Sequence, residues 1–357
     1  MQNKKFLIKN FTSAINDALK IAMSADKNTV CYGLGVTDPG GVFGTTFGLE
    51  KKFGSERVFD VPTSENALTG IGIGASLTNM KCIMTHQRLD FFLLAMDQLV
   101  NNAAKWHYMF GGKKSVPITI RLIIGRGWGQ GPTHSQNLQS WFAHIPGLKV
   151  VIPTNPYDAK GMLLSSIKDP NPVIFLEHRW LHYSKGKVPK KKYFVPINKA
   201  KVIKKGKDIT ILSMSYLTPE SIIAIKHLNK IGIYPEVIDL RSIKPLDFAT
   251  IFKSINKTKN LLVLDTGFKF CSVSSEIITT VMEKNHHILK NAPARLTMPD
   301  VPEPTSFALT KNFYITHYDI IKKVFEILKI NKKKFKQLNI NKDKFHDVPN
   351  NEFKGPF

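Results

Sequence analysis

Short apolar runs alternate with longer amphipathic stretches along the first half of the chain. The apolar runs have the length of buried strands, and the stretches between them repeat apolar residues at helical spacing. Strands that alternate with helices predict a parallel sheet covered by helices on both faces, which is an α/β fold. The predicted strands are Thr29–Leu34, Val58–Val61, Cys82–Thr85, Ile118–Ile124, Val150–Pro153 and Val173–Leu176. The predicted helices are Phe11–Ala25, Glu65–Asn79, Phe91–Phe110, Gln136–Ala143 and Tyr157–Ile167.

This rhythm is interrupted between residues 181 and 205, where YSKGKVPKKKYFVP is rich in Lys and Pro and indicates a linker. A second alternation follows, so we expect a first domain over residues 1–180 and a smaller α/β domain over residues 206–330. Residues 331–357 hold seven lysines and three acids, which predicts a basic polar tail that frays. The second set of predicted strands is Ile209–Met214, Glu236–Leu240, Leu261–Asp265 and Arg295–Thr297, and the helices are Pro219–Lys230, Ser274–Glu283 and Tyr318–Leu328.

Length and cysteine content narrow the class of protein. A chain of 357 residues suits two domains better than one core. The three cysteines, Cys31, Cys82 and Cys271, show no CxxC spacing, so neither a zinc site nor a disulfide framework is expected. No run approaches the ~20 apolar residues of a membrane span, and the first residues lack the pattern of a secretory signal. We therefore expect a cytoplasmic protein that does not enter a membrane.

The formal net charge of +24 raises the question of a nucleic-acid partner. Most basic residues are lysines scattered along the chain, with short clusters at Lys190–Lys192 and Lys332–Lys336. Scattered charge is typical of a solvated surface, because high net charge acts first on solubility and association. We therefore favour a solvated surface and expect no nucleic-acid partner.

Two glycine-rich motifs lie in different contexts. Gly70, Gly72 and Gly74 fall inside a predicted helix, with no third glycine at the offset of a dinucleotide fingerprint, so close helix packing is favoured. The glycines between residues 125 and 131 follow a predicted strand and lead to His134. Loops at the carboxyl ends of parallel strands are where α/β proteins place ligands. This loop is therefore a candidate site.

Glu65 follows a predicted strand and begins the next helix. Taken alone, it is explained by the favourable interaction of a first-turn carboxylate with the helix dipole. His134 taken alone is explained as an exposed loop histidine. The residues by themselves leave both the structural and the catalytic interpretation open.

Several long segments occur together in one order and spacing. They are DPGGVFGTTFGLEKKFGSERVFD, FDVPTSENALTGIGIGAS, DFFLLAMDQLVNNAAKWHYMFGG, PTHSQNLQSWFAHIPGLKVVIPTNPYDAKGMLLSSIKDPNPVIFLE and EVIDLRSIKPLD. In these segments the chain resembles the β subunit of the decarboxylating component of 2-oxoacid dehydrogenase complexes, of the pyruvate, branched-chain and acetoin types. The resemblance covers roughly residues 5 to 328. It implies a thiamine-diphosphate-binding pyrimidine-type domain followed by a transketolase C-terminal-like domain, both with parallel sheets.

The resemblance also implies roles for three residues. Glu65 matches the glutamate that hydrogen-bonds a ring nitrogen of the aminopyrimidine of thiamine diphosphate, where its proton activates the cofactor. Phe91 matches the aromatic residue that stacks on that ring, although its own pattern indicates only a core position. His134 matches the histidine of a His-Ser-Gln motif that lines the site and contacts the substrate. These three residues are the expected catalytic and cofactor-binding set.

Further implications concern ions and partners. Asp169 and Asn171 lie in a loop that binds a structural potassium ion in some members, through backbone carbonyls. Family α subunits carry a Gly-Asp-Gly motif that holds magnesium and the diphosphate, and no Gly-Asp-Gly occurs in this sequence. The implied enzyme is therefore an α2β2 assembly in which the partner subunit holds magnesium and the substrate is a small 2-oxoacid.

The chain departs from the family at two points. Gln87 fits the branched-chain type, but Arg88 fits neither that type nor the pyruvate type, so Arg88 is a candidate ligand for a substrate carboxylate or phosphate. An outward-facing Arg88 is the structural alternative. The lysine-rich second domain also disfavours docking on the basic peripheral domain of a lipoyl acyltransferase core. Both departures favour an alternative function, a split transketolase-like carboligase that passes an activated aldehyde to a sugar or aldehyde.

Overall fold

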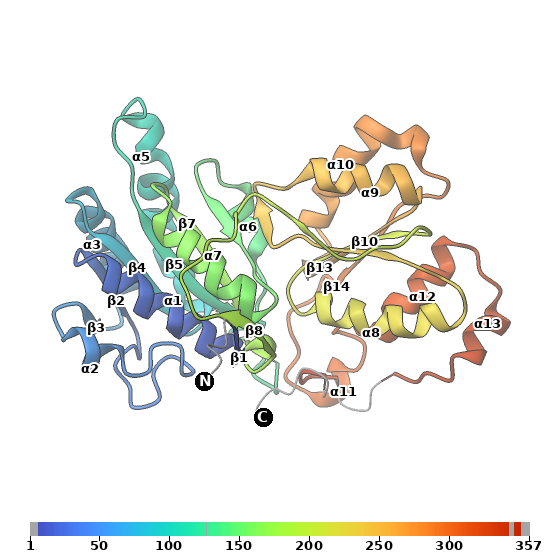
Figure 1. Ribbon diagram of the computed structural model, residues 1–357, viewed down its shortest axis with the longest axis horizontal. Coiled ribbons are helices and arrows are strands. Elements are labelled where there is room, and N and C mark those ends of the chain that lie inside the picture. The colour runs from blue at the N-terminus through green and yellow to red at the C-terminus, as the bar shows by residue number, and fades with distance from the viewer. Residues whose placement is uncertain (1–5, 126, 343–345, 351–357) are drawn as a thin grey trace.

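The computed structural model describes residues 6–125, 127–342 and 346–350. Two α/β domains lie side by side, with the first half of the chain on the left and the second half on the right in Figure 1. Each domain has a mostly parallel sheet between layers of helices. The predicted fold class is therefore confirmed, and every predicted strand is present with its ends within three residues of the predicted ones.

The first domain is built on a seven-stranded sheet of order β12-β6-β7-β5-β4-β2-β3. Its strands are parallel except β12, which runs antiparallel to β6. A separate antiparallel pair, β1 and β8, lies beside the sheet. The strands are β1 (Phe6–Asn10), β2 (Thr29–Gly33), β3 (Val58–Asp60), β4 (Lys81–His86), β5 (Ile118–Ile124), β6 (Lys149–Val151), β7 (Val173–His178), β8 (Lys185–Pro189) and β12 (Ser242–Lys244).

Side chains from this sheet alternate between two apolar cores. Cys31 and Phe175 face the core that contains α1 and α7, whereas Tyr32 and Ile174 face the core that contains the helices after β3, β4 and β5. This alternation is expected for parallel strands that are buried on both faces. The helices are α1 (Phe11–Ala25), α2 (Leu49–Phe53), α3 (Glu65–Leu77), α4 (Leu89–Phe92), α5 (Ala104–Met109), α6 (Gln139–His144) and α7 (Pro156–Lys168).

The second domain has a five-stranded sheet of order β14-β13-β10-β11-β9, in which only β9 is antiparallel to its neighbour. Helices α8 and α12 pack together on one face, and α9 and α10 cover the other. The strands are β9 (Lys201–Lys204), β10 (Thr210–Ser213), β11 (Glu236–Asp239), β13 (Leu261–Phe268) and β14 (Ala294–Met298). The helices are α8 (Leu217–Lys230), α9 (Phe248–Thr258), α10 (Val273–Asn285), α11 (Phe307–Thr310), α12 (His317–Ile327) and α13 (Lys332–Gln337).

A strand from the second half of the chain joins the sheet of the first domain, which the sequence did not indicate. Strand β12 comes from the second half of the chain but pairs with β6, so it extends the first sheet. Arg241, just before β12, donates to Asp158 of α7 at 3.0 Å and to the carbonyl of Lys199 at 2.7 Å. A charge-assisted bond between buried groups ties the second domain to the first.

Two expectations about local structure were wrong. The predicted helix Phe91–Phe110 is divided into α4, the 3-10 turn Leu93–Ala95, the π-helical stretch Gln98–Ala103 and α5. The described part of the predicted frayed tail contains α13, and His346 and Asp347 are buried against the rest of the protein. Residues 343–345 and 351–357 of that tail lie outside the described residues.

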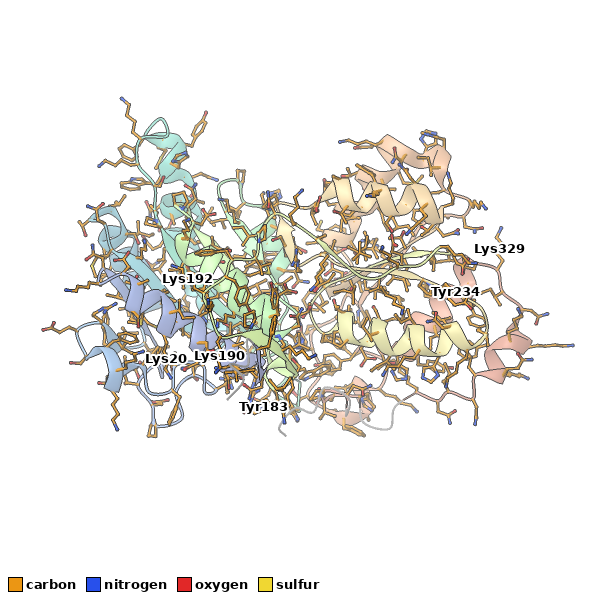
Figure 2. All side chains as sticks on the ribbon, viewed as in Figure 1. Lys20, Tyr183, Lys190, Lys192, Tyr234 and Lys329 are labelled. Carbon is orange, nitrogen blue, oxygen red and sulfur yellow. The ribbon has the colours of Figure 1, made fainter. Side chains whose placement is uncertain are left out.

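The lysine cluster at residues 190–192 lies on the surface beside α1. Figure 2 labels Lys190 and Lys192 close to Lys20 of that helix, and Lys20 and Lys190 line one shallow hollow. The segment between the domains is thus laid over the first domain, and Lys160 of α7 donates to the Pro189 carbonyl at 2.7 Å.

Candidate active site

Three of the predicted site segments meet at one edge of the first sheet. Glu65 follows β3, Phe91 follows β4 and His134 follows β5. In the sheet order β5-β4-β2-β3, β5 and β4 are neighbours and one strand separates β4 from β3, and all of these strands run parallel. Their carboxyl ends therefore lie at the same edge, where α/β proteins bind ligands.

Glu65 is the first residue of α3 and is 4% exposed. Within the described residues, its carboxyl group has no hydrogen-bond or ion-pair partner. The neighbouring Asn66 amide donates to the Leu94 carbonyl at 3.5 Å, which ties the start of α3 to the segment that carries Phe91. Neither carboxyl oxygen is among the fully enclosed polar atoms without a partner, so both oxygens keep some contact with solvent and are accessible to a ligand donor.

His134 and Arg88 each contact the Phe91 ring. The ring of Phe91 meets the ring of His134 edge to face, with centroids 5.5 Å apart. The Arg88 guanidinium stands 5.7 Å from the centroid of the Phe91 ring, and its Nη2 donates to Gln130 at 3.4 Å. Arg88 is partly buried, its Nε has no partner among the described residues, and burial lowers the pKa of the guanidinium. Arg88 is therefore packed against the Phe91 ring and the glycine-rich loop instead of extending freely into solvent.

Gln87 contacts the segment that follows β2, because its amide donates to the Leu34 carbonyl at 3.4 Å. Gln136, the last residue of the His-Ser-Gln motif, donates to Asp90 through its side chain at 2.9 Å. Asp90 therefore ties the loop that follows β5 to the helix that carries Phe91. Sequence reasoning missed this link, although both residues lie within the quoted motifs.

Two buried titratable groups near the site were also missed. Both ring nitrogens of His86, at the end of β4, lack a partner within the part of the chain that the structure describes, and burial lowers the pKa of His86 to about 4. Glu303, from the loop after β14, is 2% exposed, and burial together with the charge of Asp90 raises its pKa to about 7. Neither residue stands in a recognisable motif, so no sequence signal could have found them.

The glycine-rich loop needs its glycines. Gly125 has a φ of +60°, and a Cβ there would lie 2.0 Å from Nε2 of His178. Gly131 has a φ of +73°, and a Cβ would lie 2.3 Å from the Thr305 hydroxyl. Positive φ and close approach both favour glycine. Gly72 instead allows α3 to pack closely, as its motif indicated, since a Cβ there would lie 2.0 Å from the Tyr32 hydroxyl.

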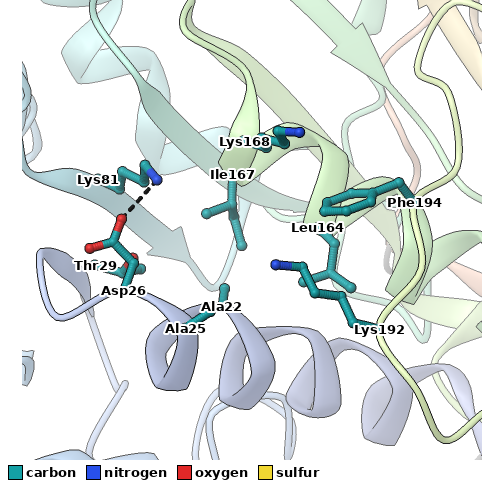
Figure 3. Close-up of a pocket in the computed structure, with 10 residues that line it drawn as sticks. All are labelled: Ala22, Ala25, Asp26, Thr29, Lys81, Leu164, Ile167, Lys168, Lys192 and Phe194. Atoms are coloured by element: carbon teal, nitrogen blue, oxygen red, sulfur yellow. Dashed lines mark hydrogen bonds and ion pairs between the residues drawn. The ribbon is translucent and has the colours of Figure 1, made fainter.

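The loop of Asp169 and Asn171 lies at the other edge of the sheet. The Asp169 carboxylate accepts from Lys149 Nζ at 2.6 Å and from the Asn171 backbone N–H at 2.9 Å. A hollow of about 280 Å³ lies at this amino-terminal edge, and Lys168 and Lys192 are among its lining residues. Figure 3 shows these residues between α1 and α7. This hollow is separate from the site of Glu65 and His134, since Thr29 and Lys81 in its wall begin strands β2 and β4.

The residues at the carboxyl edge fit an aminopyrimidine ring. Glu65 offers an oxygen acceptor or proton donor to a ring nitrogen, and the Phe91 ring, 36% exposed, is available for stacking. For metals the finding is different: among the described residues there is no cluster of three or more His, Cys, Asp or Glu side chains that could hold an ion. None of the described helices is long and apolar enough for a membrane crossing.

Comparison with known proteins agrees with this arrangement. A family model for the transketolase pyrimidine binding domain matches residues 9–183, and one for the transketolase C-terminal domain matches residues 198–320. A solved structure of a split gene transketolase, an inactive beta4 tetramer, aligns with a TM-score of 0.72 at 18% identity, covering 89% of this chain and 97% of that chain. The fold and the site thus define a two-domain chain of the transketolase type.

Two relatives narrow this class. Acetoin:2,6-dichlorophenolindophenol oxidoreductase subunit beta of Bacillus subtilis is 38% identical over 331 residues, which span 89% of this chain and 97% of the relative. The mitochondrial pyruvate dehydrogenase E1 component subunit beta of Pisum sativum is 40% identical over 295 residues, 82% of each chain. The chain belongs to the family of these β subunits, which is a family of thiamine-diphosphate enzymes.

Proposed function

We propose that this chain is the β-type subunit of a thiamine-diphosphate-dependent 2-oxoacid dehydrogenase and works with a separate α subunit in an α2β2 assembly. The observation that carries the proposal is the position of Glu65 at the carboxyl edge of the sheet, next to the segment of the exposed Phe91 ring. Glu65 is 4% exposed, and its accessible carboxyl oxygens have no partner within the described residues. In a chain of this family, that pair matches the requirements of an aminopyrimidine: a proton donor for a ring nitrogen and an apolar face.

In the proposed enzyme, different residues of this chain bind the cofactor and contact the substrate. Thiamine diphosphate, when bound, supplies the electron sink that 2-oxoacid decarboxylation needs. Glu65 holds the proton that is exchanged with the ring nitrogen, and Phe91 fixes the plane of the ring. His134, in edge-to-face contact with Phe91, is placed to meet a substrate, and Arg88 offers a fixed positive charge beside the same ring.

The need for a partner subunit is supported by the surface near the site. Ile71 on α3, Leu94 after α4 and Tyr108 on α5 are 65%, 67% and 88% exposed. Large apolar side chains exposed on neighbouring helices are typical of a protein–protein interface. The partner would cover these helices and supply magnesium and the diphosphate-binding groups.

Three further expectations remain predictions. A potassium ion at the Asp169–Asn171 loop would be held by backbone carbonyls, because the Asp169 carboxylate is already engaged by Lys149. Attachment to a lipoyl acyltransferase core is one route for the product, although the basic surface opposes docking on a basic domain. A reducing cytoplasm is supported by the three free cysteines, of which Cys271 is exposed.

The proposal is tested by co-purification with the α-type partner and calorimetry with thiamine diphosphate and magnesium. We expect tight binding by the assembled enzyme and weak binding by the isolated chain, followed by decarboxylation of at least one member of a 2-oxoacid panel. Tight stoichiometric binding by the isolated chain would contradict the two-chain proposal.

Arg88 favours a second candidate, the split transketolase-like carboligase. Its partly buried guanidinium beside Phe91 could hold the phosphate of a sugar acceptor through two parallel hydrogen bonds. The two candidates differ in their acceptor. Turnover of the assembled enzyme that requires an electron acceptor supports the dehydrogenase, whereas turnover that requires an aldehyde or a sugar phosphate supports the carboligase.

A further inference from the structure

The C-terminal segment returns to the first domain and contacts the glycine-rich loop. Asp347 is 5% exposed, although it lies beyond both family matches, the second of which ends at residue 320. Its carbonyl accepts from the Trp128 N–H at 2.8 Å, and its carboxylate accepts from the Gly129 N–H at 2.6 Å. One residue of the C-terminal segment thus binds two consecutive backbone donors of the loop.

The loop conformation explains why one residue can accept both bonds. Gly127, Trp128 and Gly129 have φ values of +67°, +53° and +65°. Successive backbone N–H groups in a turn can converge on one oxygen-bearing group, and residues 128 and 129 lie in a turn. Trp128 adopts a left-handed conformation without being glycine, which is costly unless surrounding contacts stabilise it. Asp347 provides the backbone contact, and the Trp128 ring also contacts Trp180 and Arg179.

The glycine at position 127 is required by the same contact. A Cβ at Gly127 would lie 2.8 Å from the Asp347 carbonyl oxygen and 2.9 Å from its Oδ1. A side chain there would push the C-terminal segment away from the loop. The segment is also anchored from behind, because His346 hydrogen-bonds the Thr310 hydroxyl at 2.9 Å and stacks on Phe307 at 4.3 Å between centroids.

The loop residues that bind Asp347 are followed at once by residues that contact the candidate active site. The Gln130 N–H donates to Gly127 in one turn, and the His134 N–H donates to Gly131 in the next. Gln130 accepts the hydrogen bond of Arg88, and His134 meets the Phe91 ring. The position of the loop therefore sets two contacts to residues that surround the candidate substrate position.

We infer that Asp347 is a positioning residue, which holds the glycine-rich loop so that His134 and Arg88 face the substrate. This inference rests on the proposed function for its catalytic consequence, but the contact itself lies within this chain. Asp347 touches neither the cofactor residues Glu65 and Phe91 nor the start of α3. Its loss should therefore lower turnover without weakening cofactor binding.

The test combines Asp347→Ala with two truncations, one after Lys342 and one after Asn350. Only the first truncation removes Asp347, so the second is the matched control. Hydrogen–deuterium exchange of residues 127–134 is measured on the isolated chain, and kcat, KM and thiamine-diphosphate affinity on the assembled enzyme. We expect faster exchange and a kcat lower by about 10- to 100-fold for Asp347→Ala and the longer truncation, with unchanged cofactor affinity.

Two further variants keep the inference open to contradiction if Asp347→Ala folds poorly. Asp347→Asn keeps the shape and one oxygen acceptor, so we expect a smaller effect in both measurements. Gly127→Ala should displace Asp347 from both of its bonds to the loop, so we expect at least the Asp347→Ala phenotype. The double variant should be no worse than Gly127→Ala alone, because Gly127→Ala has already removed the contact that Asp347→Ala weakens. Additive effects, or unchanged exchange in every Asp347 variant, would overturn the inference. An assembled wild-type enzyme without activity would instead refute the proposed function. The hydrogen–deuterium exchange result would still decide whether Asp347 holds the glycine-rich loop.

Discussion

The Phe91 ring meets the His134 ring edge to face, with centroids 5.5 Å apart and an interplanar angle of 87°. The positive edge of one ring thus faces the negative face of the other, which is a favourable geometry for aromatic pairs. The contact joins the helix after β4 to the loop after β5. It places the histidine beside the ring that is proposed to stack on the cofactor, and hence beside the carbon where a substrate would react.

His134→Ala is expected to spare cofactor binding and to impair turnover. The imidazole contacts Phe91 from the loop side, whereas the cofactor position is defined by Glu65 and the other parts of the Phe91 ring. A general acid–base group contributes ~100- to 10,000-fold in rate, so the loss in kcat should fall in that range. Cofactor affinity and steady-state rates of the assembled enzyme give the answer. His144→Ala, at the exposed end of α6, is the control, and an equal effect in both variants would remove His134 from the mechanism.

Arg88→Met is expected to discriminate between substrates. If Arg88 binds a distal carboxylate or phosphate, its loss should lower kcat/KM for anionic substrates by about 10-fold or more and spare neutral 2-oxoacids. Arg88→Lys keeps the charge but not the paired hydrogen bonds, so it should lie between the wild type and the Met variant. Equal losses on anionic and neutral substrates would show that Arg88 only supports the Phe91 ring.

The fold could be predicted wherever the local pattern decides the structure. Helix α1 has the predicted bounds Phe11–Ala25, because Asn10 caps it and its apolar face repeats regularly. Strand β12 and the pair of β1 and β8 escaped prediction, since their stability comes from partners far away in sequence. Helix α9 was missed although Asp247 caps it through the Thr250 N–H, a signal that the sequence does contain.

The residues of the candidate site also divide into those that the sequence could indicate and those that it could not. Glu65, Phe91 and His134 lie in motifs, and parallel strands bring their loops to one edge, so the sequence could indicate them as a set. Asp347 could not be found, because it approaches the glycine-rich loop across 218 positions of the chain and lies in a polar segment that indicates fraying. Tertiary contact, rather than local propensity, gives this segment its structure.

Glu303 makes the stability of the protein depend on pH. Its folded pKa of about 7 lies above the ordinary value of 4.5, so the folded state favours the protonated carboxyl group. The stability that this group contributes is fully present below its unfolded pKa and is lost as the pH rises through 7. Glu303→Gln should therefore gain about 2–3 kcal/mol relative to the wild type between pH 5 and 8. Denaturant unfolding at several pH values, with the exposed Glu283→Gln as control, measures this, and parallel pH curves for wild type and variant would contradict it.

Glu65→Gln is expected to abolish activation of the cofactor almost completely while leaving the fold intact. A carboxylic acid can transfer its proton to the ring nitrogen, and the carboxylate that remains stabilises the positive ring. An amide can hydrogen-bond the same nitrogen but cannot transfer the proton, so the rate should fall by ~100- to 10,000-fold. Stability should change little, because Gln is nearly isosteric and the Glu65 carboxyl group has no partner to lose within the described part of the chain.

The structural alternative predicts the opposite result for the same substitution. If Glu65 only interacts with the dipole of α3, Glu65→Gln should cost ~0.3–1 kcal/mol of stability and leave catalysis normal. Glu50→Gln is a matched control, since Glu50 is an exposed first-turn acid of α2. Proton–deuterium exchange at the thiazolium carbon, followed by NMR on the assembled enzyme, separates the two interpretations. Exchange at the wild-type rate in Glu65→Gln would show that another group activates the cofactor, because removal of a required proton donor must slow this step.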